Sequence, residues 1–241
     1  MKQTGRAPQP EEEKDRRTKE PHYGCCFEAE DRYGRHTFGL MSNWTWIENP
    51  KHILFLFARY KFVARMLEGL PKVLEIGCAD ALATRIVSQA VGSLVATDFD
   101  PIFIQDAKNR MIDQHSFDCR VHDILAGPVP GEFDGAYSLD VIEHVRPEKS
   151  QVFVSNIVSS LKPTGVLIIG TPSLASQIHA SPVSRQGHVN CLSHEELKSL
   201  LSNYFHNVFI FSMNDEVVHT GFYPMAHYLL ALCCHKKTGT G

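Results

Sequence analysis

Two short apolar segments, each followed by polar turn residues, constrain the fold of this chain more than any other feature. The first, Val73–Ile76, runs into Gly77, and the second, residues 94–97, runs into Asp98. The segment between them, residues 80–90, is predicted to be a helix. This layout predicts a βαβ unit in which the glycine lets the backbone pass close to a ligand and Asp98 accepts both hydroxyls of a ribose.

The alternation of apolar strands and helical segments continues along the chain. Strands are predicted at residues 72–76, 94–97, 118–121, 135–139, 166–170, 208–211 and 228–234. Helices are predicted at residues 50–70, 80–90, 101–114, after Pro147 and at 193–201. Asn49 is expected to cap the first of these helices, and Ser193 with Glu196 forms a predicted capping box. The pattern predicts an α/β fold with a doubly wound, mostly parallel sheet of seven strands.

Composition changes along the chain suggest three parts. Residues 1–22 are charged and proline-rich and are predicted to be a disordered tail. Residues 23–70 are expected to form a helical and aromatic cap, either a lid over a pocket or a layer packed on the domain. Residues 71–235 are expected to form the main domain, with substrate loops at 171–193 and 213–226.

Overall composition excludes several classes of protein. The net charge of −3 gives no reason to expect a nucleic acid or an anionic membrane as a partner. The seven cysteines lack the spacing of a zinc site, so we expect free thiols in a reducing compartment. No signal peptide or membrane span is recognised, which predicts a cytoplasmic protein.

The order of the motifs is similar to that of class I S-adenosylmethionine (SAM)-dependent methyltransferases. The resemblance covers roughly residues 50–235, and it is closest to the group that contains the ubiquinone-biosynthesis O-methyltransferases. Its motifs are residues 75–79, Asp98, residues 121–124, 133–145 and 161–172. Residues 187–190 and 204–208 also resemble methyltransferases of bacterial surface-sugar gene clusters. The resemblance implies a Rossmann-like methyltransferase fold with SAM as the cofactor.

The expected cofactor site combines residues read from the sequence with residues that the resemblance implies. Asp98 is expected to bind the ribose, Phe99 to stack on adenine, and Arg59 either to bind the methionine carboxylate or to cover core surface. The resemblance implies that Glu75 holds groups near the methionine amine and that Asp123 accepts from the adenine amino group. The remaining candidates are Gly77, Cys78, Ala79, Ile124 and Leu139. Ala79 and Ala81 stand where the family usually has glycine.

Residues 133–145 are the most diagnostic segment, because a strand there leads into Asp140, Glu143 and His144. His144 is a candidate general base, since imidazole titrates near neutral pH. The resemblance implies that the same three residues hold a divalent cation, and a structural role is the third alternative. His188 and His219 are alternative bases in the expected substrate loops.

The function expected from these features is methyl transfer to a small polar metabolite, preferably O-methylation of a sugar or nucleotide-sugar. The alternatives are N- or C-methylation of another small molecule, or a catalytically silent SAM-fold binding protein. A nicotinamide-dependent oxidoreductase is disfavoured because residues 77–82 lack the second and third glycines of G-x-G-x-x-G. The expected partner is a small-molecule substrate, with no nucleic acid and no membrane, and a homodimer is left open.

Overall fold

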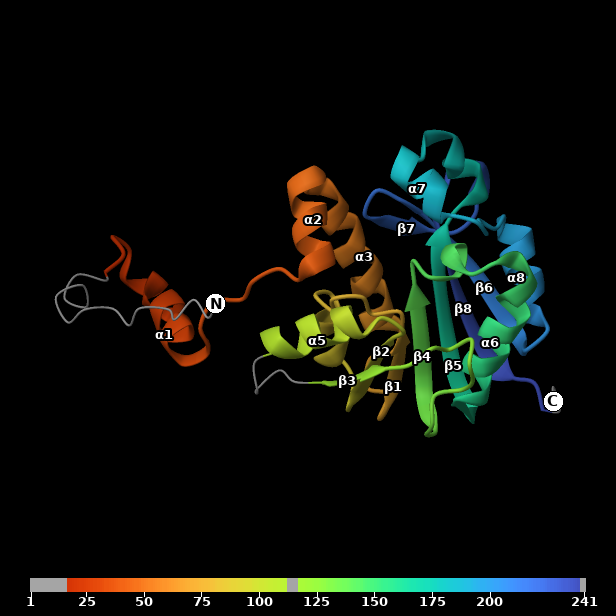
Figure 1. Ribbon diagram of the computed structural model, residues 1–241, viewed down its shortest axis with the longest axis horizontal. Coiled ribbons are helices and arrows are strands. Elements are labelled where there is room, and N and C mark those ends of the chain that lie inside the picture. Colours follow the sequence, from red (N-terminus) through yellow and green to blue (C-terminus); the bar gives the residue numbers. More distant parts are fainter. Residues whose placement is uncertain (1–16, 112–116, 239–241) are drawn as a thin grey trace. The chain divides into compact units, whose positions relative to one another are not determined.

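Eight strands form one sheet in the order β3-β2-β1-β4-β5-β8-β6-β7 (Figure 1). This computed structural model describes residues 17–111 and 117–238. The strands are β1 Val73–Ile76, β2 Leu94–Asp98, β3 Asp118–Val121, β4 Phe133–Leu139, β5 Leu161–Pro172, β6 Phe205–Asn214, β7 Val217–His219 and β8 Tyr228–Lys236. Strands β1 to β5 pair in parallel, whereas β8, β6 and β7 are joined to the sheet by antiparallel pairs.

The predicted α/β fold with a mostly parallel sheet is confirmed, and all seven predicted strands are present. The count of seven is wrong because β7 adds an eighth strand inside the expected loop 213–226. Asp215 takes a left-handed backbone conformation (φ 48°), and the chain turns back so that β7 pairs with the end of β6. A strand of three residues is too short to give a periodic signal in the sequence.

The helices cover the sheet on both faces, as strands buried on two sides require. They are α2 Leu40–Glu48, α3 Lys51–Met66, α4 Thr84–Ser88, α5 Pro101–Arg110, α6 Ser150–Ser159, α7 Pro182–Gly187 and α8 His194–Ser202. One core lies under α6 and α8, and the other lies under α3, α4 and α5. The short 3-10 helices are η4 Ile142–His144, η5 Pro147–Lys149, η6 Leu174–His179 and η7 Tyr223–Met225.

Contacts divide the chain into two units, residues 1–37 and 38–241. Within the described part of the first unit, η2 (Pro21–Tyr23) and α1 (Gly24–Tyr33) have no buried residues. The expected tail lies mostly outside the described residues, which begin at residue 17. Among the residues described, no helix combines the length and the apolar character needed to cross a bilayer.

Local sequence signals gave mixed results at the helix ends. The capping box of Ser193 and Glu196 is confirmed. The expected cap by Asn49 is wrong, because Asn49 is the C-cap of α2, and α3 begins at Lys51 without a side-chain cap. The helix predicted over residues 80–90 is shorter, since α4 starts only at Thr84 after a turn that contains left-handed Ala81.

Candidate functional site

The turn after β1, residues 77–81, brings backbone close to other strand ends. Gly77 has φ 77°, and a Cβ there would lie 2.3 Å from Val141 Cγ2, so no other residue fits. Ala79 (φ 45°) and Ala81 (φ 55°) hold the left-handed conformation that glycine adopts without strain. Each alanine therefore costs about 1 kcal/mol relative to a relaxed backbone. The turn keeps the shape of a glycine turn even though two of its residues carry methyl groups.

Asp98, at the end of β2, is buried and holds this turn in place. Its Oδ2 accepts a hydrogen bond from Ala79 N at 2.9 Å, and its Oδ1 accepts one from Asp100 N at 2.9 Å. The α5 helix is capped by Asp100, which accepts from Ile102 N at 2.8 Å, so Asp98 is not the cap. A carboxylate has about four acceptor sites, which leaves Asp98 capacity for two further donors.

A pocket of about 520 Å³ opens at the carboxyl ends of β1, β2 and β4, where open α/β sheets bind ligands. Its lining includes Gly77, Phe99, Asp123, Ile124 and His144. The Phe99 side chain is 74% exposed, which makes its ring available for stacking. Residues predicted from four separate motifs thus surround one space.

Glu75 lies below the turn and is fully enclosed. Its carboxylate accepts hydrogen bonds from Tyr60 OH at 2.6 Å and Thr84 Oγ1 at 2.7 Å, groups that come from α3 and α4. Burial raises the pKa of Glu75 to about 7, although both hydroxyls act in the opposite direction. Glu75 therefore braces two helices against β1.

Arg59 and Asp140 form a part-buried ion pair beside the turn. Arg59 Nη1 donates to both carboxylate oxygens of Asp140 at 2.8 Å, and the guanidinium lies over the ring of Tyr228, 3.8 Å from its centroid. Asp140 has φ 57°, a left-handed conformation that the ion pair helps to hold. Arg59 Nε is buried and has no hydrogen-bond partner among the described residues.

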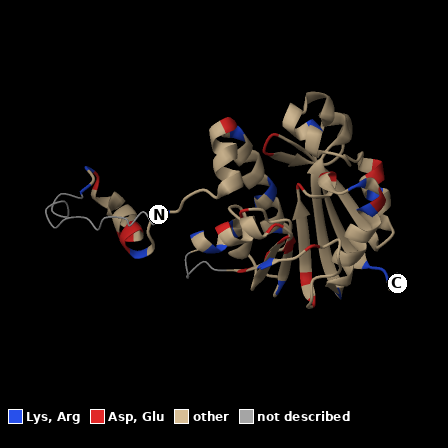
Figure 2. Cartoon of the chain, in the orientation of Figure 1, with Lys and Arg blue, Asp and Glu red and all other residues tan. Residues whose placement is uncertain are grey.

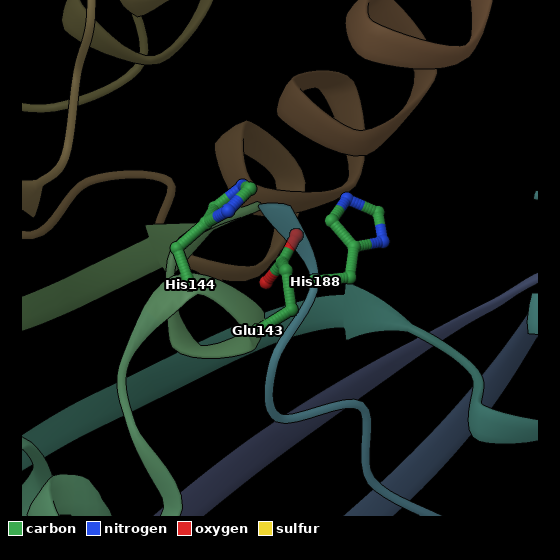
Figure 3. Close-up of side chains that lie close together, drawn as sticks. All are labelled: Glu143, His144 and His188. Carbon is green, nitrogen blue, oxygen red and sulfur yellow. The ribbon is translucent and has the colours of Figure 1, made fainter. Parts of the chain in front are cut away.

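Glu143, His144 and His188 converge at the same edge of the sheet (Figure 3). One ligand atom from each lies within 4.8 Å of the others. Glu143 Oε2 accepts from Thr171 Oγ1 at 3.1 Å, whereas the buried Oε1 has no partner in the described structure. Burial first, and then the charge of Asp140, raises the pKa of Glu143 to about 8. The structure thus brings Glu143 and His144 together with His188, whereas the third residue expected from the sequence, Asp140, pairs with Arg59.

The two imidazoles of this cluster each hold Nδ1 against a carbonyl oxygen. His144 Nδ1 lies 3.0 Å from Gly187 O, and His188 Nδ1 lies 3.2 Å from Gln177 Oε1. A carbonyl oxygen only accepts, so each neutral ring carries its proton on Nδ1 and keeps the lone pair of Nε2. Burial lowers the pKa of His188, which favours this neutral form.

Comparison with known proteins agrees with this geometry. Residues 74–169 match the family described as "Methyltransferase domain". The ubiquinone biosynthesis O-methyltransferase of Xanthomonas campestris pv. campestris (strain B100) is 27% identical over 127 residues, 52% of this chain and 52% of that protein. The chain thus spans about half the length of the curated relatives it matches. Residues 74–169 of the chain are therefore similar to a methyltransferase domain.

Two solved structures share the fold of this chain. N-methyltransferase NodS from Bradyrhizobium japonicum WM9, in complex with S-adenosyl-L-homocysteine, has a TM-score of 0.60 and 19% identity, and the match covers 82% of this chain and 93% of that one. A TehB-like SAM-dependent methyltransferase from Corynebacterium glutamicum has a TM-score of 0.57 and 18% identity, and the match covers 90% of this chain and 100% of that one.

Some of the site residues predicted from the sequence lie apart from the pocket lining. Cys78 and Leu139 are buried in the core, and His219 on β7 bonds to Asn214 Oδ1 at 2.7 Å. Sequence reasoning missed Gln177 and the carbonyl of Gly187, which orient the two histidines. No sequence signal could reveal them, because η6, which carries Gln177, and α7, which ends at Gly187, are positioned beside the histidines only by tertiary contacts.

Proposed function

We propose that this chain transfers the methyl group of SAM to an oxygen atom of a small polar molecule. One observation carries the proposal: Gly77, Phe99 and Asp123, which follow three different strands, line the same pocket as His144. The residues expected to bind SAM and the candidate base are thus close enough to act on SAM and an acceptor molecule bound side by side. The methyltransferase fold of the domain supports this reading.

The proposed cofactor site assigns each part of SAM to a side chain of matching chemistry. Asp98 would accept the two ribose hydroxyls, Phe99 would stack on adenine, and Asp123 would accept from the adenine amino group beside Ile124. Arg59 Nε, buried without a partner, suits the methionine carboxylate. The complex of NodS with S-adenosyl-L-homocysteine supports SAM as the cofactor.

The other predicted cofactor residues would act by shaping the site. Gly77, Cys78 and Ala79 supply the turn against which the cofactor would lie, and Leu139 fills the core under it. Glu75 would hold the turn through α3 and α4. These roles explain why residues without a free polar group belong to the site.

Methyl transfer needs little more than alignment and a path for one proton. The acceptor oxygen attacks the methyl carbon, the carbon–sulfur bond breaks, and S-adenosylhomocysteine leaves as a neutral thioether. The hydroxyl proton would pass to Nε2 of His144, whose Nδ1–H is held by Gly187 O. His188 offers a second Nε2 in the same cluster, and His219 is a more remote alternative.

The same cluster fits a divalent cation. Glu143 Oε1 lacks a partner, and both histidines present Nε2 while a carbonyl oxygen fixes Nδ1, the arrangement found around metal-bound imidazoles. A bound cation would supply charge that lowers the pKa of the acceptor hydroxyl. Asp140 would stay outside this ligand set, because Arg59 occupies both of its oxygens.

The acceptor is proposed to be a hydroxyl compound because the loop over residues 171–193 carries many hydrogen-bonding side chains. A sugar or nucleotide-sugar remains the preferred class, on the likeness of residues 187–190 and 204–208 to enzymes of surface-sugar clusters. Nitrogen or carbon acceptors, and the absence of any activity, are alternative outcomes of the test.

Calorimetry tests the cofactor first. The chain is expected to bind SAM and S-adenosylhomocysteine but not NAD, and Asp98→Ala is expected to weaken that binding at least tenfold, on the order of 1.4 kcal/mol. Asp100→Asn is the matched control, since it changes the neighbouring acid yet can still cap α5. Wild-type affinity in Asp98→Ala would remove Asp98 from the site.

The acceptor is then sought by following radiolabelled methyl transfer to panels of sugars, nucleotide-sugars and phenols, with and without a chelator. Transfer to a hydroxyl supports the proposal, and loss of transfer on chelation assigns the cluster to a cation. SAM binding without transfer to any class would favour the catalytically silent protein.

A further inference from the structure

The N-terminus of α2 is capped by the turn after β1 rather than by its own sequence. Gly39, at the N-cap position, has no side chain to satisfy the free amides of the first turn. Asp80 does so instead: its Oδ2 accepts from Ser42 N at 2.6 Å and its Oδ1 from Ser42 Oγ at 2.8 Å. Both residues are buried, so water does not replace these bonds readily.

A second carboxylate tightens the same junction. Asp106 on α5 accepts from Leu40 N at 3.2 Å, and Arg110 bonds to Asp106 as well as to the backbone oxygen of Asp80. A Cβ at Gly39 would lie 2.5 Å from Asp80 Cβ, so the chain passes the turn with no spare room. The start of α2 therefore cannot shift unless the turn shifts with it.

This turn is the one against which the cofactor is proposed to lie. Asp80 stands between Ala79 and Ala81, both left-handed, and Ala79 N donates to Asp98, the proposed ribose ligand. Ribose hydroxyls bound to Asp98 would act directly on the hydrogen bond that sets the turn. Because Asp80 directly follows Ala79, a change in the backbone of the turn also moves the side chain of Asp80.

Beyond its first turn, α2 has little of its surface buried. Ser42 is its one buried residue, and Leu40, Trp44 and Ile47 form an exposed apolar stripe at i, i+4 and i+7. Glu48 is its only charged residue, and Figure 2 shows α2 almost uncoloured. In Figure 1, α2 stands beyond the carboxyl ends of the parallel strands. A helix so placed is suited to meet an acceptor.

We propose that Asp80 is a positioning residue that couples the cofactor to α2. Cofactor binding fixes the turn, the turn fixes Asp80, and Asp80 fixes the first turn of α2. The acceptor would then meet an α2 that the bound cofactor holds more firmly. This inference rests on the proposed function, because it takes the turn as part of the SAM site.

The chain carries its own probe for this coupling. Its two tryptophans, Trp44 and Trp46, both lie on α2, so tryptophan emission reports on that helix alone. S-adenosylhomocysteine is titrated into the full chain while emission, binding heat and amide hydrogen exchange of residues 40–48 are followed. In the wild-type chain the ligand is expected to shift the emission and to slow exchange in α2.

Asp80→Asn should break the coupling, because an amide has one acceptor oxygen, whereas the carboxylate accepts from Ser42 N on one oxygen and from Leu82 N in the turn on the other. Its emission and exchange are expected to stop responding to the ligand. Linkage requires a matching loss of ligand affinity, about fivefold or more. Ser42→Ala removes only the Oγ bond and is expected to give a partial loss of both.

Thr45→Ala is the matched control, since it removes a hydrogen bond inside α2, from Thr45 Oγ1 to Met41 O at 3.0 Å, and leaves Asp80 intact. It should respond as the wild-type chain does. Should Asp80→Asn fail to fold, as judged by circular dichroism, Ser42→Ala decides the question.

The outcomes separate this inference from the proposed function. Absence of any binding heat in the wild-type chain would sink the proposed function. Binding heat without a change in emission or exchange would overturn the coupling alone. If Asp80→Asn or Ser42→Ala showed the same ligand-induced change in emission and exchange as the wild-type chain, Asp80 would have no part in the coupling.

Discussion

The carboxyl ends of β1 and β4 each present a buried glutamate, and the two differ in how they are satisfied. Glu75 receives hydrogen bonds from Tyr60 and Thr84. Glu143 receives one from Thr171, and its Oε1 has no partner among the described residues. Burial raises the pKa of both carboxyl groups, to about 7 and about 8.

This difference favours a structural role for Glu75 and the proposed functional role for Glu143. A buried polar atom without a partner costs about 1–3 kcal/mol, so folding alone would not favour it. Glu143 lies in the cluster with His144 and His188, where a proton or a cation would satisfy its free oxygen. Glu75, with both oxygens satisfied by neighbouring helices, is part of the framework.

The largest expected effect is on catalysis. Glu143→Gln keeps the shape of the side chain but removes the carboxyl oxygen that would exchange a proton or hold a cation, so methyl transfer is expected to fall about 100-fold or more. The free energy of unfolding should change by less than about 1 kcal/mol, because a neutral amide is cheaper to bury. Radiolabel transfer and urea unfolding measure the two effects. Glu148→Gln, an exposed acid on η5, is the control, and equal rates in the two variants would erase the distinction.

The next largest effect is expected on stability, at Glu75 on β1. Glu75→Ala leaves the hydroxyls of Tyr60 and Thr84 without their acceptor and opens a cavity, so we expect a loss of about 3 kcal/mol in the free energy of unfolding. Urea denaturation followed by circular dichroism measures it. Glu68→Ala, whose side chain is 63% exposed, should change stability by less than about 0.5 kcal/mol. A loss as small in Glu75→Ala would contradict the framework role.

A pH series sharpens the assignment of Glu75. Its pKa is about 7 in the folded chain against an ordinary value of 4.5, so the folded state holds the proton more tightly than the unfolded state. The stability from this group is complete below about pH 4.5 and is lost as the pH rises towards 7. Glu75→Gln cannot lose a proton, so the free energy of unfolding should fall less steeply than in wild type. Parallel curves from about pH 5 to about pH 8 would refute the raised pKa.

The smallest expected effect concerns Ala81, in the turn of residues 77–81 that follows β1. Ala81→Gly relieves a left-handed alanine, a gain of about 1 kcal/mol, but adds about 0.5 kcal/mol of backbone entropy to the unfolded chain. A net stabilisation of about 0.5 kcal/mol is expected from thermal or urea unfolding. Ala83→Gly, at φ −82°, relieves no strain and should destabilise instead. Destabilisation in both variants would show that the methyl group of Ala81 packs usefully.

Much of the fold was predictable because its signals are local. Runs of apolar residues of strand length, such as Val73–Ile76, alternate with helical segments and turns, and this pattern alone leads to a parallel sheet covered on both faces. Because parallel strands end at one edge, Asp98, Asp123 and His144 could be expected near each other. The capping box at Ser193 was readable for the same reason, since its partners are three residues apart.

The sequence by itself thus determined the fold class and the residues at the strand ends. The tertiary structure alone decided which of those residues are free to act. Arg59 pairs with Asp140, which is 81 positions away in the sequence, and His188 lies with Glu143 and His144. Asp80 bonds to Ser42, which is 38 positions away. Hydrogen bonds and ion pairs between distant segments depend on three-dimensional distance, and no periodicity in the chain encodes that distance.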